Sequence, residues 1–249
     1  MIVLKTRNEI AMMREAGKIS AHALWAGVNA VEVGKSTFEI DRVIHNAIVK
    51  AGAKPSFLGY GGFPASACIS INQQVIHGIP SRNKIIQEGD IVSLDVGALY
   101  KGYHGDNAYT VGAGKISPEN EQLLAVTKKC LELGIAAAQA GNRLGDIGNA
   151  VQTYAESFGY GVIREYVGHG IGKKLHEEPE VPNYGIPGRG CRLASGMTIA
   201  IEPMINMKGA GVTVLDDEWT VVTNSGLPSA HFEHTVAITD NGPVILTEL

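Results

Sequence analysis

Two histidines stand out in the third quarter of the chain, one of them between two glycines. His169 lies between Gly168 and Gly170, and His176 follows seven residues later. Glycine lowers the stability of regular structure by roughly 0.5–1 kcal/mol relative to alanine and adds no side-chain packing. Two glycines around one imidazole therefore indicate that another group approaches the backbone closely. The chemistry depends on which other side chains meet His169.

Carboxylates within apolar segments are the candidate partners, because a buried charge is unfavourable unless it is paired or binds a metal. Asp95 and Glu202 each follow a run of apolar residues. Asp106 comes eleven residues after Asp95, so one straight strand would place them on opposite faces. A hairpin turning at Tyr100–Lys101 would instead place the two aspartates directly opposite each other.

Together with Glu233, these side chains predict a metal site. The proposed cluster consists of Asp95, Asp106, His169, Glu202 and Glu233. Its four carboxylates would balance two divalent cations, and carboxylate bridges suit a metal pair about 3.5–4 Å apart that activates water. An oxygen-rich site with one imidazole favours Mn, Fe, Co or Zn. His104, His231 and His234 remain alternative ligands, because spacing does not choose among them.

Composition limits the class of protein. The chain has 249 residues, of which 45% are apolar and 18% charged, with a net charge of −4. This balance argues against a nucleic-acid-binding surface. No apolar run approaches the roughly 18 residues that a membrane span needs, and the first residues lack a signal-peptide layout. The widely spaced Cys68, Cys130 and Cys191 favour reduced thiols in a cytoplasmic protein over a redox or disulfide-bonded one.

Capping boxes and apolar periodicity predict the elements that would position these residues. Helices are expected over about 7–30, 37–50, 117–139 and 145–157. Strands are expected over 65–75, 91–100, 106–111, 162–167, 198–205, 219–223 and 231–238.

The chain also matches itself when its two halves are shifted by 107 residues. Gly34 then falls on Gly141, and Asp95 falls on Glu202. Each half has the same order of two helices followed by strands. We therefore predict an internal duplication, in which Asp95 and Glu202 face each other across a pseudo-two-fold axis.

The region around His169 resembles the signature of type I methionine aminopeptidases, within the wider family that includes prolidase and aminopeptidase P. That signature has an aromatic residue or Met, any residue, Gly-His-Gly, an aliphatic and a small residue, and then a second His. Residues 166–176 fit it, and 181–184 fit its continuation. The resemblance covers essentially the whole chain. It implies that the proposed cluster is the metal site, with Glu233 preferred to its neighbouring histidines, and that the glycines let metal and substrate approach the backbone.

The resemblance further implies the pita-bread fold, of the α/β (α+β) class. This fold has two pseudo-two-fold related helix–helix–strand halves around a central, antiparallel-rich sheet, in agreement with the repeat. We accordingly predict a single catalytic domain over 1–249, with halves of roughly 1–113 and 114–249.

Residues that contact substrate also follow from the resemblance. His77 and His176 match the two substrate-facing histidines, and we expect them to hydrogen-bond the scissile amide and the tetrahedral intermediate. Glu202 is expected to transfer a proton to the leaving amine. The implied methionine pocket consists of Phe57, Tyr60, Phe63, Cys68, Leu175 and Trp219. Phe57 and Leu175 stand where bacterial relatives carry Cys and Phe, and Gly97 replaces a Thr of some relatives, which leaves the shape of the pocket open.

The expected function is a hydrolase: a dinuclear metalloaminopeptidase that removes the initiator methionine from nascent proteins when the second residue is small. Its cofactors would be two divalent ions among Co, Mn, Fe and Zn. We expect a cytoplasmic monomer that meets nascent chains at the ribosome and binds neither nucleic acid nor membranes. The alternatives are a peptidase like prolidase or aminopeptidase P, which usually carries a substantial N-terminal domain, and a non-catalytic peptide-binding module, which should lack the ligands.

Overall fold

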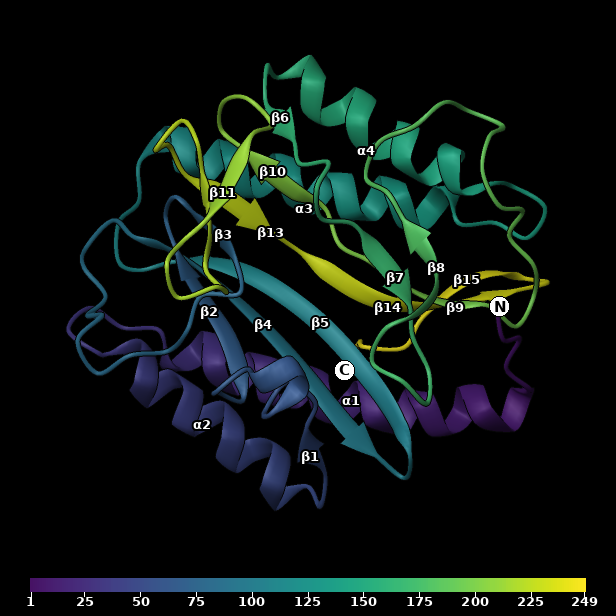
Figure 1. Cartoon of the computed structure of the whole chain (residues 1–249), viewed down its shortest axis with the longest axis horizontal. Helices are drawn as coiled ribbons and strands as arrows, with labels where there is room; N and C mark the ends of the chain where they lie inside the picture. The colour runs from purple at the N-terminus through teal and green to yellow at the C-terminus, as the bar shows by residue number, and fades with distance from the viewer.

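Two helices open the chain, which a computed structural model describes over all of residues 1–249 (Figure 1). α1 is Arg7–Ala30 and α2 is Thr37–Lys50, and both predicted spans are confirmed. Each begins at a capping box: the hydroxyl groups of Thr6 and Ser36 accept the backbone N–H of the glutamate three residues later. These hydrogen bonds satisfy amides that have no partner within the helix, which explains why the boundaries could be predicted.

The second half of the chain also begins with two helices. α3 is Pro118–Ala137 and α4 is Leu144–Ser157, each within two residues of its predicted bounds. Figure 1 shows α1 and α2 along one side of the molecule and α3 and α4 along the other, with the strands between them. None of the helices combines the length and the apolar composition that a membrane crossing requires.

A nine-stranded sheet lies between the helix pairs. Its strands are β1 (Lys54–Pro55), β2 (Ala67–Ile71), β4 (Ile91–Tyr100), β5 (Tyr103–Gly112), β7 (Gly168–Gly170), β8 (Glu177–Val181), β9 (Thr198–Ile201), β14 (Glu233–Thr239) and β15 (Gly242–Ile245). The order along the sheet is β1-β4-β5-β14-β9-β7-β8, while β2 pairs with β4 and β15 with β14. All these pairings are antiparallel. The pairing of β5 with β14 joins the first half of the chain to the second.

Two three-stranded sheets accompany the large one. One consists of β6 (Gly161–Val162), β10 (Met204–Asn206) and β13 (Ser229–His231), and the other of β3 (Gln74–Ile76), β11 (Val212–Val214) and β12 (Val221–Thr223). A short 3₁₀ turn, η1 (Tyr60–Gly62), precedes β2.

Several predicted strands were wrong in their extent. The predicted strand 198–205 is split into β9 and β10, and 231–238 is split into β13 and β14. The first break lies at Glu202–Pro203, because proline has no N–H to donate to a neighbouring strand. Segment 65–75 forms β2 and the start of β3, and only the beginning of 162–167 is a strand.

The β4–β5 hairpin corrects the predicted position of the aspartates. Its turn is Lys101–Gly102, with φ of 48° and 83°, as a tight two-residue hairpin turn requires. The turn is therefore centred one residue later than expected. Asp106 pairs with Gly97 rather than with Asp95, which lies two residues along on the same face. The two aspartates are diagonal neighbours, not direct partners.

The 107-residue offset recurs in the backbone hydrogen bonds. The N–H of Gly34 donates to the carbonyl of Ile86, and that of Gly141 donates to the carbonyl of Leu193. Both glycines have positive φ, 92° and 99°. Two isolated β-bridges are also related to each other by 107 residues. These repeated local contacts support the proposal that the two halves arose by duplication.

Apolar side chains fill a separate core in each half. Ile44 and Leu94 belong to the core under α2, and Leu123 and Ile147 belong to the core under α3 and α4. A smaller cluster between them contains Phe63 and other aromatic residues. The site described next lies where this third cluster meets the strands of both halves.

Candidate active site

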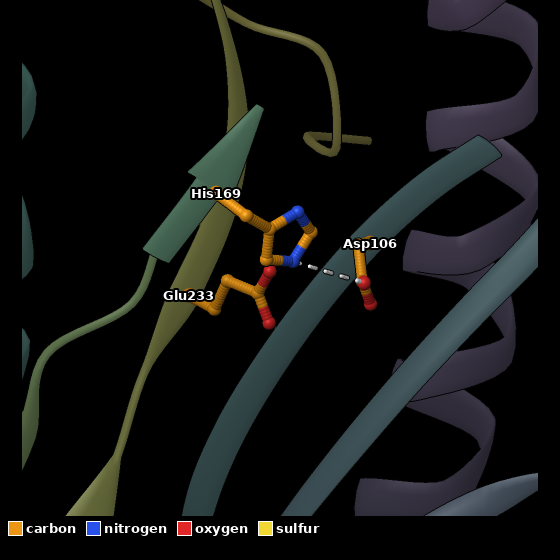
Figure 2. A group of neighbouring side chains, drawn as sticks. All are labelled: Asp106, His169 and Glu233. Atoms are coloured by element: carbon orange, nitrogen blue, oxygen red, sulfur yellow. Dashed lines mark ion pairs between the residues drawn. The ribbon is translucent and has the colours of Figure 1, made fainter. Parts of the chain in front are cut away.

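The five predicted ligands come together in the middle of the molecule. They project from different segments of the large sheet: Asp95 from β4, Asp106 from β5, His169 from β7, Glu233 from the start of β14, and Glu202 from the residue after β9. Figure 2 shows three of them pointing toward one another from separate strands. The ligand atoms of Asp106, His169 and Glu233 lie within 4.8 Å of one another.

His169 presents one ring nitrogen to the carboxylates. Its Nε2 atom lies 4.0 Å from Asp106 Oδ2, as Figure 2 shows. The same atom lies 3.6 Å from Glu202 Oε1. Burial, reinforced by the nearby His176, lowers the pKa of His169 to about 3, so the ring is neutral. Nδ1 donates to the carbonyl oxygen of Gly170 at 2.8 Å. The lone pair of Nε2 therefore faces the carboxylates, in the tautomer that a metal ligand needs.

The glycines around His169 have a different role from the one expected. A Cβ atom at Gly168 would collide with the backbone carbonyl of Ala200, and one at Gly170 with that of Glu178. The group that approaches the backbone is thus the neighbouring strand on each side. Glycine permits β7 to pack between β8 and β9, and this packing fixes the direction of the His169 side chain.

Several buried polar atoms of the cluster have no hydrogen-bond partner. They are Asp95 Oδ1, Asp106 Oδ1, Glu233 Oε1 and His231 Nε2. Unpaired carboxylate oxygens in a buried site are costly, and no lysine or arginine lines the cavity to compensate them. The donor set of carboxylates and neutral imidazole suits a divalent metal. The residues present therefore fit the metal site that was predicted.

Burial strongly alters the protonation of the carboxylates. It raises the pKa of Asp95 to about 7 and that of Glu202 to about 8. Burial, followed by the charge of Asp95, holds the pKa of Asp106 well above its usual range. Burial, followed by the charge of Asp106, has the same effect on the pKa of Glu233. In the absence of metal the cluster therefore holds protons near neutral pH, and metal ions must displace them.

Two of the three alternative histidines are engaged elsewhere. His104 Nδ1 hydrogen-bonds with Ser56 Oγ at 2.9 Å, and His234 Nδ1 with Thr247 Oγ1 at 2.9 Å. Neither side chain lines the cavity above the cluster.

His231, in contrast, joins the cluster. Its Nε2 atom lies 3.5 Å from Glu202 Oε2, and its ligand atom is within 4.8 Å of those of Glu202 and Glu233. His231 lies two residues before Glu233, a spacing that places both side chains on one face of an extended chain. The five-residue set thus omitted a neighbour that contacts it.

A cavity of about 250 Å³ opens onto the cluster. All five predicted ligands line it, together with the six residues of the predicted methionine pocket: Phe57, Tyr60, Phe63, Cys68, Leu175 and Trp219. Phe63 and Trp219 meet edge to face, with ring centroids 5.1 Å apart. The cavity therefore combines an apolar, aromatic wall with an acidic floor, and its size suits one large side chain.

His77 and His176 line the same cavity. His77 has φ of 58°, which is uncommon for a residue other than glycine, and its ring centroid lies 6.3 Å from that of Trp219. Burial lowers the pKa of His77 to about 4 and also lowers the pKa of His176. His176 Nδ1 lies 2.7 Å from Tyr60 Oη. Both histidines are thus neutral hydrogen-bonding groups beside the acidic floor.

Two of the departures from related sequences, Phe57 and Gly97, prove to be in contact. A Cβ atom on Gly97 would lie 2.8 Å from Phe57 Cε1 and 2.8 Å from Ser56 Cβ. Real Cβ atoms do not approach so closely in a packed interior. Phe57 and Ser56 therefore both occupy space that a threonine at position 97 would need.

Gly97→Thr is expected to lower the free energy of unfolding by about 1–3 kcal/mol, because it overpacks this contact. In a Phe57→Cys background the same substitution should cost at least about 1 kcal/mol less, because the ring is gone. Urea unfolding of the wild type, both single variants and the double variant gives the coupling energy. Additive effects would show that the two positions are independent.

Comparisons with known proteins agree on one family. The sequence model that describes metallopeptidase family M24 matches residues 11–240 of this chain. The methionine aminopeptidase of Clostridium acetobutylicum is 53% identical over 247 residues, which cover 99% of each chain. Methionine aminopeptidase 1 of Bacillus subtilis is 48% identical over 249 residues, which cover 100% of each chain.

Solved structures agree with the sequence relatives. The methionine aminopeptidase of Thermotoga maritima superposes with a TM-score of 0.98 at 45% identity, over 100% of both chains. A prolidase from Pyrococcus furiosus has a TM-score of 0.80 at 26% identity, over 99% of this chain but 66% of that one. The predicted pita-bread fold is confirmed, and prolidase has a further part that the match does not include.

Proposed function

This chain belongs to metallopeptidase family M24, and we propose that it removes the initiator methionine from nascent polypeptides whose second residue is small. The full-length similarity to methionine aminopeptidases favours this activity over that of prolidase. The observation that carries the proposal is that a cavity sized for one large apolar side chain opens directly onto the carboxylate–histidine cluster. The protein is accordingly a metal-dependent hydrolase.

Asp95, Asp106, His169, Glu202 and Glu233 would hold a pair of divalent ions among Mn, Fe, Co and Zn. When bound, such ions act as Lewis acids and lower the pKa of water toward neutrality. The unpaired carboxylate oxygens and the orientation of His169 Nε2 support this assignment.

The other residues of the cavity would bind and orient the peptide. The polarisable thioether of methionine suits a wall built from aromatic rings such as Phe63 and Trp219. His77 and His176, both neutral, would donate hydrogen bonds to the carbonyl oxygen of the scissile amide as negative charge develops there. Glu202 would accept a proton from the attacking water and deliver it to the leaving amine nitrogen.

The chain would act as a single catalytic domain. This is supported by the origin of the cluster, because Asp95 and Asp106 come from the first half and His169, Glu202 and Glu233 from the second.

The cellular setting forms a further part of the proposal. The resemblance to the family supports a cytoplasmic monomer that meets nascent chains at the ribosome. Sedimentation of the purified protein alone measures whether it is a monomer. Sedimentation with ribosomes measures whether it binds them.

Peptide hydrolysis separates the proposed function from its alternatives. The metal-loaded protein is incubated with Met-Ala-Ser and with a dipeptide ending in proline, and metal content is measured in the same sample. We expect free methionine from Met-Ala-Ser and no cleavage of the proline dipeptide. A prolidase-like enzyme would show the reverse, and a peptide-binding module would cleave neither.

In the metal-free protein, the free energy of unfolding is expected to fall as the pH rises from about 4 to about 8. The pKa of Asp95 is about 7 and that of Glu202 about 8 in the folded, metal-free protein, against about 4 in an unfolded chain. The folded protein therefore binds more protons than the unfolded chain in this window, and its free energy of unfolding decreases with pH.

Bound metal should oppose this trend, because protons and metal compete for the same oxygens. Thermal melting with and without a chelator at pH 5 and pH 8 provides the measurement. Chelation should lower the Tm, and the difference should be larger at pH 8. A Tm that is unaffected by chelator at pH 8 would contradict the proposed charge of the cluster.

A further inference from the structure

His231 has a buried ring nitrogen that no other group of the protein satisfies. The residue is 1% exposed, and its Nε2 atom has no hydrogen-bond partner. Buried polar atoms in folded proteins nearly always have such a partner, so an exception requires an explanation. The other unpaired atoms of the cluster are oxygens of Asp95, Asp106 and Glu233, which the proposed function assigns to metal. His231 thus shares this feature with three of the proposed ligands.

We propose that His231 is a sixth metal ligand, which gives the second of two bound ions an imidazole of its own. The inference rests on the proposed function, because it requires a pair of divalent ions in the cluster. It adds His231 to the five predicted ligands and replaces none of them.

The candidate ligands form two groups that share one carboxylate. The first group consists of Asp106, His169 and Glu233 (Figure 2). The second group consists of Glu202, His231 and Glu233. Within each group the ligand atoms lie within 4.8 Å of one another. Each group therefore contains one imidazole, and Glu233 is placed to contact both ions.

The spacing around Glu202 matches a pair of metal ligands better than a hydrogen bond. His231 Nε2 lies 3.5 Å from Glu202 Oε2, and His169 Nε2 lies 3.6 Å from Glu202 Oε1. Hydrogen bonds from N–H to oxygen usually measure about 2.7–3.2 Å between the heavy atoms. Two donors that lie about 2.0–2.2 Å from one tetrahedral zinc ion are about 3.3–3.6 Å apart. Glu202 thus has an imidazole beside each oxygen, at the separation expected for ligands of a common ion.

Backbone contacts hold His231 in this position. β13 pairs with β10 so that His231 lies opposite Met204, two residues after Glu202. The N–H of His231 donates to the hydroxyl of Thr110 at 2.9 Å, and that hydroxyl donates to the carbonyl of His231 at 2.8 Å. The sheets therefore place the ring beside the cluster in advance, as a precise metal site requires.

Proton NMR of the cobalt-loaded protein counts the imidazole ligands directly. The unpaired electrons of Co²⁺ move the ring N–H signal of a coordinated imidazole far from its usual position. A neutral ring that binds metal through one nitrogen carries a proton on the other, so wild-type protein with both ions should show about two such signals, from His169 and His231. The variant His231→Leu should show about one.

Calorimetric titration of zinc into the metal-free protein tests the same ligand by affinity. Loss of a residue that only orients a ligand weakens metal binding by about 10–100-fold, so His231→Leu should weaken binding of the second ion by at least about 100-fold. Binding of the first ion should change far less. The loss should also be smaller for manganese, because imidazole suits zinc whereas carboxylates suit manganese.

His234→Leu is the matched control, because that ring hydrogen-bonds with Thr247 and lies outside the cavity and both ligand groups. It should keep both ions and both shifted signals. His231→Gln, which keeps a polar side chain, takes the place of His231→Leu in the titration if leucine prevents folding. The spectrum of the wild type needs no variant.

A single shifted imidazole signal in wild-type protein that holds both Co²⁺ ions would overturn the assignment of His231. Binding of both zinc ions by His231→Leu with wild-type affinity would overturn it as well, and would leave the ring a partner of Glu202 alone. In either case, methionine release from Met-Ala-Ser by the wild type would leave the proposed function intact. Two shifted signals without methionine release would instead support His231 as a ligand and refute the proposed function.

Discussion

Asp106→Asn is expected to abolish stoichiometric metal binding and to lower kcat/KM for Met-Ala-Ser by at least about 10³-fold. Asp106 is 3% exposed, and its Oδ1 atom has no hydrogen-bond partner. The amide would replace an anion with a neutral group and direct an NH₂ donor at the other ligands. Lewis-acid stabilisation by bound metal is worth several kcal/mol, and each 1.36 kcal/mol is tenfold in rate.

The fold should tolerate this substitution. The backbone N–H and carbonyl of Asp106 both pair with the hydroxyl of Thr235, and neither hydrogen bond involves the carboxylate. Metal content after gel filtration, melting temperature and turnover are measured together. Asp146→Asn is the control, because that half-buried carboxylate caps the start of α4 outside the cavity. Wild-type metal content and activity in Asp106→Asn would remove Asp106 from the metal site.

His77→Ala is expected to retain both metals and to lower kcat by about 10²–10³-fold, the usual effect of removing one donor to a developing oxyanion. His77 lines the cavity but lies outside the groups of candidate ligands. Its ring is neutral because burial lowers its pKa to about 4. A hydrogen bond that strengthens only in the transition state affects kcat more than KM.

The backbone at His77 requires a second variant. With φ of 58°, position 77 is strained for alanine, whereas asparagine adopts this region more readily. Similar losses in His77→Ala and His77→Asn would therefore assign the effect to the imidazole. His22→Ala, an exposed position on α1, is the control. An unchanged kcat in both His77 variants would exclude the proposed role of the ring.

The helices and the candidate ligands were accessible from sequence for local reasons. A capping box uses residues three apart, so Thr6 and Ser36 mark the helix starts without any tertiary information. Asp95 and Glu202 could be singled out because a carboxylate after a run of apolar residues needs a partner. The 107-residue repeat then related the two carboxylates to each other.

Other features depend on contacts between distant segments. The register of the β4–β5 hairpin required the conformation of Lys101–Gly102, and three-residue strands such as β10 are too short to show a period. Sequence spacing likewise gave no sign that Gly168 and Gly170 admit neighbouring strands. The contacts of Phe57 with Gly97 and of Tyr60 with His176 join segments that meet only in the folded chain.

Titration of metal into the metal-free protein, with methionine release from Met-Ala-Ser as the readout, tests the central claim most directly. The cluster of four carboxylates and His169 predicts no release without metal and a rise in activity that saturates at about two ions per chain. The same titration of Asp106→Asn should restore little or no activity. Methionine release by protein that contains no detectable metal would contradict the assignment of this cluster as the catalytic metal site.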